Sequence, residues 1–364
     1  MTNKPTLLAY LNGMPDVEST YPVLARLHKR GKVRVRTLVY SKLLRKEKRL
    51  TRAFQAEGFM PEAASKWRMK VFYKKDIDAA DAVLTIADPN WDPTNRKQRG
   101  THIRNTSQQC IFLQHGAYQM GVNGPLPISP MTFYSQCLLL WEPLGNNRDL
   151  FAPESAGRVR AVGFTKKNVL PINTWGPDVS DWVLKHPTRL LVCQSFRWGG
   201  GRYSSDQIAN FYNLMDEMLT KHPKVGIIIR SHRGKVRKNH RGHDEALAKK
   251  HPNVMFSHYY SGPLAKASIH DVIDLCDAMI SPTSTTVLDC IYSGKPAAVF
   301  AEDVDVFANL QQISNAETFE KFIGSLADYD PVYDTIRTRF GALDHNLDRA
   351  AKVIEDHLFV TCKS

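Results

Sequence analysis

Short apolar runs alternate with helical segments along this chain, and that alternation constrains the fold more than any other feature. Runs such as Val225–Ile229 and Ala278–Ser281 have the length and composition of buried strands. Helical periodicity follows several of them, for example where Ile208, Phe211 and Met215 share one face. Strands that alternate with helices predict an α/β fold with mostly parallel sheets.

The length of 364 residues predicts two domains rather than one. A stretch rich in Pro, Asn, Gly and Trp, residues 165–187, interrupts the alternation, which then begins again. We therefore predict an N-terminal domain over residues 1–170, a second domain over 171–340 and a closing helix over 341–364.

The composition is that of a cytoplasmic globular protein. Hydrophobic residues make up 43% and charged residues 23% of the chain, and no apolar run approaches the ~18 residues that cross a membrane. The N-terminal segment lacks the pattern of a signal peptide. Six cysteines without a CxxC pair are typical of buried free thiols in a reducing compartment.

Polar residues that follow strands in the first domain are candidate catalytic groups, because ligands of parallel sheets bind at the strands' carboxyl ends. His115 follows the strand 110–113 and precedes Gly116, so it could take a proton from an attacking hydroxyl. Asp88 and Asp92 follow the strand 82–87 and are alternative bases. Both aspartates could equally form turns, and His115 could be structural.

A hydroxyl-rich turn in the second domain predicts an anion site. Four consecutive hydroxyl residues separate the strand 278–281 from the following helix. They are Thr283, Ser284, Thr285 and Thr286. The positive end of the helix dipole and its N–H groups suit phosphate oxygens, although N-capping alone would need only one hydroxyl. We include Asp289, from the same helix, in this predicted donor site.

Two further strand ends in the second domain complete the predicted donor site. Arg230 and His232 follow the strand 225–229 and could hold a diphosphate or ribose, or belong to a basic surface loop. Ser195 and Arg197 lie in the glycine-rich loop after the strand 189–193. That loop lacks the spacing of a dinucleotide fingerprint or a P-loop.

These elements resemble a known group of enzymes. The strand followed by Arg-x-His, the hydroxyl turn before a helix ending in Gly294-Lys-Pro296, and the upstream Gln114-His-Gly116 are similar to bacterial surface-polysaccharide transferases of the GT-B fold. Capsule-type Kdo transferases and CDP-glycerol glycerophosphotransferases are the nearest in pattern. Those families usually have Arg-Pro-His-Pro where this chain has Arg230-Ser-His-Arg233. The likeness covers residues 188–300 well and the first domain only at His115.

The resemblance implies two Rossmann-like domains with parallel sheets facing across a cleft. It implies a nucleotide-activated donor in the second domain, an acceptor in the first, His115 as base and catalysis without a metal or other cofactor. It favours CMP- or CDP-linked donors over UDP-linked ones. Asp303-Val-Asp305 matches a metal motif of three letters only and is more typical of a solvated loop.

Positive charge is concentrated in residues 26–75, which hold 17 Lys and Arg against three acids, a net of 17 − 3 = +14. We predict that this window contacts an anionic membrane surface or an acidic acceptor, and we rank nucleic acid last because no nucleic-acid-binding module is recognisable. A merely solvated face is the alternative. The helical part contributes Arg45, Lys46, Lys48, Arg49 and Arg52.

The sequence thus predicts a glycosyltransferase at the inner face of the cell membrane, moving a sugar from a nucleotide-activated donor to a glycan or lipid-linked acceptor. Three alternatives stay open. They are a CDP-glycerol-type glycerophosphotransferase, an enzyme like the UDP-sugar 2-epimerases, and a basic protein that binds polyanions or nucleic acid.

Overall fold

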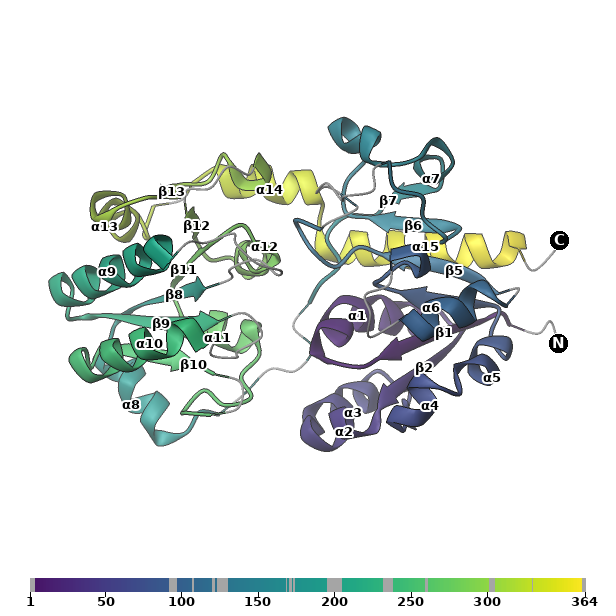
Figure 1. Cartoon of the computed structure of the whole chain (residues 1–364), viewed down its shortest axis with the longest axis horizontal. Coiled ribbons are helices and arrows are strands. Elements are labelled where there is room, and N and C mark those ends of the chain that lie inside the picture. The colour runs from purple at the N-terminus through teal and green to yellow at the C-terminus, as the bar shows by residue number, and fades with distance from the viewer. Residues whose placement is uncertain are drawn as a thin grey trace. The chain divides into compact units, whose positions relative to one another are not determined.

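The structure is a computed structural model in which the chain forms two α/β units (Figure 1). Unit 1 comprises residues 1–170 and 338–364, and unit 2 comprises residues 171–337, so that unit 2 is inserted between two segments of unit 1. The structure describes residues 4–91, 97–106, 108–119, 122, 130–167, 169, 172, 174–194, 205–231, 238–258, 261–300, 305–328 and 330–361.

Unit 1 is built on a seven-stranded sheet of order β3-β2-β1-β4-β5-β6-β7, in which all neighbours are parallel. Its strands are β1 (Thr6–Leu11), β2 (Arg34–Tyr40), β3 (Glu62–Ala64), β4 (Ala82–Thr85), β5 (Gln109–Leu113), β6 (Cys137–Leu140) and β7 (Val159–Ala161). Every residue of β1, β4 and β6 is buried, as expected of a parallel sheet that is covered on both faces.

The helices of unit 1 are α1 (Met14–Arg30), α2 (Ser41–Lys46), α3 (Lys48–Ala56), α4 (Lys66–Lys70), α5 (Tyr73–Asp78), α6 (Lys97–Arg104), α7 (Pro153–Ala156) and α15 (Leu343–Thr361). Two helical segments have bounds that hydrophobic periodicity alone does not give. The segment 41–56 is interrupted at Glu47, whose φ of −111° and ψ of 72° are not helical. Helix α1 begins at Met14, where the Asp16 carboxylate accepts hydrogen bonds from the backbone N–H groups of Asn12 and Gly13.

Unit 2 contains a six-stranded sheet of order β10-β9-β8-β11-β12-β13, again parallel throughout. Its strands are β8 (Thr188–Gln194), β9 (Val225–Ser231), β10 (Val254–Ser257), β11 (Ala278–Ser281), β12 (Ala297–Phe300) and β13 (Gln312–Ile313). Its helices are α8 (Pro177–Lys185), α9 (Ser205–Lys221), α10 (Lys238–Lys250), α11 (Ile269–Leu275), α12 (Thr285–Tyr292), α13 (Ala316–Gly324) and α14 (Val332–Phe340), the last of which runs back into unit 1.

Several local predictions are confirmed. Ile208, Phe211 and Met215 of α9 are buried in the core of unit 2. Cys110, Cys137, Cys193, Cys276 and Cys290 are buried free thiols, whereas Cys362 lies outside the described residues. None of the helices in the described part of the chain is long and apolar enough to cross a membrane.

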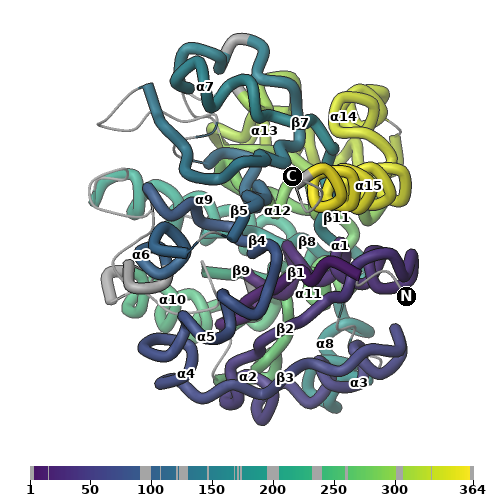
Figure 2. Tube along the Cα trace, turned by 90° about the vertical axis from the view of Figure 1, so that its right-hand side faces the viewer, coloured from purple at the N-terminus to yellow at the C-terminus, as the bar shows by residue number. Residues whose placement is uncertain are grey.

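The C-terminal helix α15 packs against α1 in unit 1, as Figure 2 shows. Charged contacts join the two helices. Arg30 forms two hydrogen bonds of 2.8 Å with the carboxylate of Glu355, which is 2% exposed, and Arg26 contacts Asp344 at 2.8 Å. The buried apolar face of α15, which includes Leu347, enters the core that α1 and β1 share.

Asn346 fixes the return of the chain into unit 1. Its fully buried side-chain amide donates hydrogen bonds to the carbonyl oxygens of Phe164, at 3.0 Å, and Phe340, at 2.7 Å. Gly163 and Gly341 have φ values of +87° and +79°, and a Cβ at either would lie within 2.5 Å of the Asn346 side chain. Glycine is therefore required at both positions, for backbone conformation and for space.

Replacing Asn346 with alanine should lower the free energy of unfolding by about 2–4 kcal/mol, because the carbonyl oxygens of Phe164 and Phe340 each lose the hydrogen bond from its buried amide, although Phe340 keeps the bond from the Phe164 N–H. Chemical denaturation followed by circular dichroism measures this change. Asn213→Ala, on the exposed side of α9, is the matched control and should change stability little. Equal effects of the two substitutions would contradict the assigned role of Asn346.

Candidate functional site

The candidate donor site lies at the carboxyl edge of the unit 2 sheet. The chain adds β9 and β10 on one side of β8 and then crosses to place β11 on its other side. The strand order therefore reverses between β8 and β11. Parallel α/β sheets bind ligands at such reversals, beyond the carboxyl ends of the strands. Unit 1 has the same kind of reversal between β1 and β4.

The hydroxyl turn lies at this reversal, between the end of β11 and the start of α12. Ser284 is the N-cap residue of α12, and its hydroxyl accepts a hydrogen bond of 3.4 Å from the Thr286 N–H. The Ser281 hydroxyl is fully buried and lies 3.3 Å from that of Thr286. Residues 283–286 are half-buried, so that their outer surface remains accessible. The turn thus presents hydroxyls and the positive end of a helix dipole at one place.

Arg230 is brought to the same edge, on the strand next to β8, but its guanidinium is held from within the protein. Its Nη1 donates to the Ser257 hydroxyl at 2.5 Å and to the Ala267 carbonyl at 3.2 Å, and the residue is 9% exposed. Cys193, its register partner on β8, lies between this cation and the hydroxyl turn. Burial raises the pKa of the Cys193 thiol to about 11, while the Arg230 charge and hydrogen bonds with Thr286 and Ser281 lower it.

Asp289, which the sequence assigned to the donor site, faces the interior. Its Oδ1 lies 3.3 Å from Nε2 of His270 on α11, and both side chains are almost fully buried. The pair joins α11 to α12 beneath the hydroxyl turn. Asp289 is therefore placed to position the helix start rather than to contact a ligand from the surface.

Several predicted site residues lie outside the described part of the chain. They are Asp92 in unit 1 and Ser195, Arg197 and His232 in unit 2. The same holds for Asp303 and Val304 of the three-letter metal motif. Among the described residues, no group of three or more His, Cys, Asp or Glu side chains could hold a metal ion.

A polar cluster near the carboxyl end of β8 was not foreseen. The Tyr212 hydroxyl donates to Oδ1 of Asp244 at 2.6 Å and lies 3.0 Å from Nδ1 of His240, and Gln194 donates to both Tyr212 and Asp244. Burial raises the pKa of Asp244 above its ordinary value, although hydrogen bonds from Tyr212 and Gln194 oppose this. Burial also lowers the pKa of His258, partly offset by Asp244.

His240 and His243 both belong to α10. His240, Asp244 and Leu247 recur at helical spacing and are buried together on one face. That spacing is the signal in the sequence that could have revealed the cluster. Gln194 immediately precedes the glycine-rich loop, so the cluster anchors β8 where that loop begins.

In unit 1, His115 follows β5 at the carboxyl edge and is half-buried. Its backbone is held by two glutamines. The Gln114 amide accepts from the Trp141 N–H and donates to the Gly116 carbonyl, both at 2.8 Å, while the His115 N–H donates to the side chain of Gln119 at 3.1 Å. These bonds fix the turn that carries the imidazole.

Asp88 has a structural environment. It is fully buried, and its carboxylate accepts from the Asn90 N–H at 3.0 Å, the Tyr134 N–H at 2.9 Å, and both the N–H and the hydroxyl of Ser135 at 2.9 and 2.6 Å. The lone pairs of this carboxylate are thus occupied by four donors from within the protein. The geometry supports the turn-forming alternative for Asp88.

Much of the positive charge of residues 26–75 is neutralised within unit 1. Arg26 and Arg30 pair with acids of α15, and Arg36 and Arg68 share Glu62 and Asp76. On α2 and α3 the predicted surface residues Arg45, Lys46, Lys48 and Arg52 are exposed, and Arg49 lies half-buried, 3.7 Å from Glu47. The basic surface is thus narrower than the sequence count of +14 indicates.

Comparisons with known proteins bear on the fold. No protein-family model and no curated protein sequence matches this chain. Among solved structures, a putative UDP-N-acetylglucosamine 2-epimerase from Listeria monocytogenes is 13% identical with a TM-score of 0.65, covering 97% of this chain and 95% of that one. The UDP-GlcNAc 2-epimerase from Neisseria meningitidis bound to UDP-GlcNAc is 14% identical with a TM-score of 0.60, covering 97% and 99%.

The wall teichoic acid polymerase TagF, soaked with CDPG, is 13% identical with a TM-score of 0.57, covering 99% of this chain and 89% of that one. Likeness at such identities shows the fold, and function has to be argued from the site. The predicted fold class, two Rossmann-like domains with parallel sheets as in GT-B enzymes, is confirmed.

The shared acids of the Arg36 and Arg68 cluster should make stability fall in acid. Hydrogen bonds from Arg36 and Arg68 hold the pKa of Glu62 below 4.5, and arginine contacts hold that of Asp76 below 3.8 even though burial alone would raise it. Because both pKa values are lower in the folded state, this stabilisation is present at neutral pH and lost as the pH falls through them.

Replacing Asp76 with asparagine should therefore make the free energy of unfolding less dependent on pH below about 5. Urea denaturation at a series of pH values measures the slope. Asp78→Asn, which removes an exposed carboxylate on the same helix, is the control and should keep the wild-type slope. The assignment fails if the two variants show the same slope.

Proposed function

We propose that this protein is a nucleotide-sugar enzyme, specifically a glycosyltransferase that moves a sugar from a nucleotide-activated donor to a glycan or lipid-linked acceptor. The observation that carries the proposal is the hydroxyl turn of residues 283–286, which opens α12 at the strand-order reversal of unit 2. A diphosphate needs a preorganised set of donors and positive potential, and this turn supplies both.

In this proposal the donor phosphates contact the hydroxyls and N–H groups at the start of α12. Arg230 stabilises the negative charge that develops on the departing nucleotide, from a position fixed by Ser257 and Ala267. A guanidinium that is already held loses little conformational entropy when the ligand arrives. The buried contact between His270 of α11 and Asp289 of α12 holds α12 in position.

The acceptor hydroxyl is activated from unit 1. His115 takes its proton as the hydroxyl attacks the anomeric carbon, and the bond from that carbon to the nucleotide phosphate oxygen breaks. Gln114 and Gln119 hold the histidine turn for this role. We propose that the arginine charge and the helix dipole stabilise the leaving group without a metal. The donor is linked to a cytidine or a uridine nucleotide, and the sequence resemblance favours cytidine.

A second candidate function is favoured by the comparisons. Solved structures of UDP-GlcNAc 2-epimerases have the same fold along nearly the whole chain, so a reaction within the nucleotide sugar itself is the alternative. The wall teichoic acid polymerase TagF also has this fold, and a CDP-glycerol-type glycerophosphotransferase is a further alternative. An epimerase forms product without an acceptor, whereas a transferase consumes donor only when an acceptor is present, apart from slow hydrolysis.

A nucleotide should stabilise the folded protein. We expect one of CMP, CDP, UDP and UDP-GlcNAc, at ~100 times its dissociation constant, to add about 2.7 kcal/mol and raise the unfolding midpoint by roughly 5–10 °C. The double variant Thr283→Val, Thr285→Val removes two hydroxyls but keeps the Ser284 cap, and should abolish that shift. Differential scanning fluorimetry is the measurement.

The control is Thr220→Val, Thr335→Val, which removes two exposed hydroxyls elsewhere in unit 2 and should retain the full shift. Absence of a shift with every nucleotide, in a protein that binds any polyanion, would overturn the enzyme proposal. It would favour the polyanion-binding alternative.

Replacing His115 with alanine should leave the nucleotide-induced shift intact and reduce turnover by roughly 10²–10⁴-fold, because only proton transfer is lost. Release of free nucleotide from the donor identified above measures turnover, with a crude cell-envelope glycan extract as acceptor. Asp88→Asn is expected to act instead through stability, because the carboxylate is a hub of buried hydrogen bonds. Wild-type turnover in the His115 variant would remove this residue from the mechanism.

A further inference from the structure

Four large apolar side chains between residues 60 and 72 are exposed to solvent. The exposed fractions are 59% for Met60, 71% for Trp67, 41% for Val71 and 63% for Phe72. Among the described residues, the other exposed large apolar side chains are Leu184, Phe359 and Val360. A single exposed apolar residue needs no explanation, but a local group of them marks an interaction surface.

The geometry of α4 places Trp67 and Val71 outward. Ser65 caps the helix by accepting from the Arg68 N–H, and the Val71 N–H donates to the Trp67 carbonyl at 2.8 Å. Residues four apart lie on the same helix face, so Trp67 and Val71 are neighbours. Met69, on the opposite face, is buried in the core beneath α4 and α5. The exposed apolar face is therefore additional to the one that folds the unit.

Ion pairs fix α4 and α5 to the sheet. Arg68 donates to both carboxylate oxygens of Asp76, at 2.9 and 2.6 Å, and Nη2 also reaches Glu62 of β3 at 3.1 Å. Arg36 of β2 donates to the same Glu62 at 2.8 and 3.1 Å. Burial and opposite charges on both sides make this a rigid support. The exposed side chains are thus presented by an ordered element.

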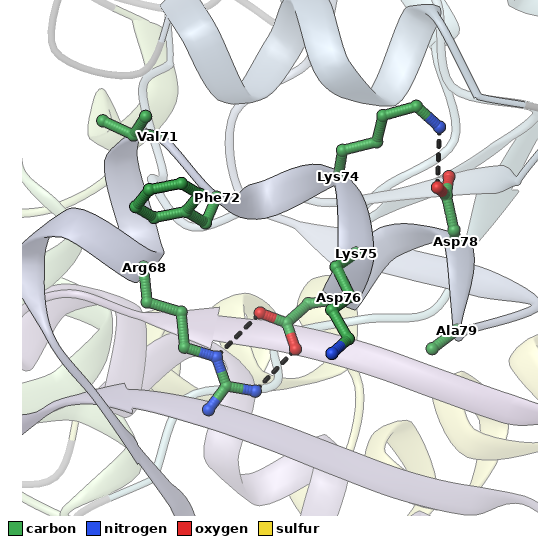
Figure 3. Close-up of a pocket in the computed structure, with 8 residues that line it drawn as sticks. All are labelled: Arg68, Val71, Phe72, Lys74, Lys75, Asp76, Asp78 and Ala79. Carbon is green, nitrogen blue, oxygen red and sulfur yellow. Dashed lines mark hydrogen bonds and ion pairs between the residues drawn. The ribbon is translucent and has the colours of Figure 1, made fainter.

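A surface pocket lies beside this face (Figure 3). Val71, Phe72 and Ala79 give it apolar walls, and Lys74 and Lys75 contribute ammonium groups. Lys74 pairs with Asp78 at 2.6 Å, whereas Arg68 is turned toward Asp76, as Figure 3 shows. Asp76 and Asp78 also line the pocket and pair with Arg68 and Lys74, which leaves Lys75 as the cation of this lining that has no ion pair among the described residues. Apolar walls beside the Lys75 ammonium group fit a ligand that is both anionic and amphiphilic.

Three exposed lysines surround the apolar side chains without an acidic partner. Lys66, Lys70 and Lys75 make no ion pair with any residue that the structure describes. The arginines nearest to them are occupied by Glu62 and Asp76. The net charge of this surface is therefore positive, and it is carried by long flexible ammonium groups.

From this combination we infer that the face formed by Lys66, Trp67, Lys70, Val71, Phe72 and Lys75, called the α4 face below, binds the surface of an anionic membrane. The indole and phenyl rings enter the headgroup region, and the lysines contact lipid phosphates. The inference deepens the lipid-linked acceptor of the proposed function and rests on it for its biological purpose. Physically, it depends only on the α4 face.

Two competing assignments fit less well. Helices α2 and α3 carry exposed cations, but Leu43, Leu50 and Phe54 point into the core, so that surface offers charge without apolar contact. Nucleic acid is bound by phosphate contacts combined with base stacking, for which Trp67 and Phe72 have rings but the aliphatic Val71 does not. A bilayer interface accommodates aliphatic and aromatic side chains equally beside lysines.

Sedimentation with vesicles tests the inference. The whole protein should bind vesicles that contain phosphatidylglycerol, should not bind phosphatidylcholine alone, and should bind less as salt is added. The triple variant Lys66→Gln, Lys70→Gln, Lys75→Gln should bind roughly 100-fold more weakly. The variant Trp67→Ser, Phe72→Ser should bind at least about tenfold more weakly. Both variants replace exposed side chains, so both should fold.

Matched controls separate this site from general charge and apolarity. Lys224→Gln, Lys249→Gln, Lys321→Gln makes the same change in net charge on unit 2, and Leu184→Ser, Val360→Ser removes two other exposed apolar side chains. Both controls should bind vesicles like wild type. Equal loss in controls and α4 variants, or loss of RNA homopolymer binding with vesicle binding unchanged, would overturn the inference.

The nucleotide-induced unfolding shift is measured on the same variants and should stay at the wild-type value. If the protein fails to bind vesicles but keeps the nucleotide-induced shift, the membrane-binding role of the α4 face is rejected and the proposed donor site is retained. Failure of the shift with intact vesicle binding sinks the proposed function and leaves a membrane-binding protein.

Discussion

Parallel strand pairing is the constraint on which the rest of the structure depends. A parallel neighbour requires a crossover, and each crossover returns the chain so that every strand ends at the same edge. In unit 2 this places Arg230, Ser257 and Ser281, which are distant in sequence, at one edge of the sheet. The strand order reverses between β8 and β11, and the hydroxyl turn follows β11 at this reversal. The strand order alone therefore determines where on this sheet a ligand would bind, whatever side chains lie there.

The buried charged side chains at this edge form contacts within the protein. Arg230 is held by Ser257 and Ala267, and Asp289 by His270, so neither is a mobile group waiting for a ligand. Such groups act through their field and through the position they impose on neighbours. Asp88 repeats the pattern in unit 1 with four hydrogen bonds. Among the described residues at this edge of unit 2, the hydroxyls and backbone N–H groups of residues 283–286 are half-buried and can be reached by a ligand.

The sequence allowed the strands and the fold class to be predicted, because buried parallel strands are continuous apolar runs that periodicity detects directly. The hydroxyl turn was also predictable, since its position depends on adjacent residues. Neutralisation of the basic window was not, because the acids that pair with Arg26 and Arg30 lie at the other end of the chain. Likewise, three of the four hydrogen bonds to Asp88 come from positions 134 and 135, more than 40 residues away. Local pattern identifies a functional group, whereas distant contacts decide whether it is occupied.

The insertion of unit 2 within unit 1 has a consequence for synthesis on the ribosome. When residue 337 has been added, all of unit 2 has been made, but unit 1 still lacks the segment 338–364. Unit 2 can therefore complete its core first, while the surface of α1 that α15 covers stays open to water or to chaperones. A ribosome that stops early in that last segment would release a finished unit 2 attached to an unfinished unit 1, which quality-control proteases would recognise by its uncovered apolar side chains.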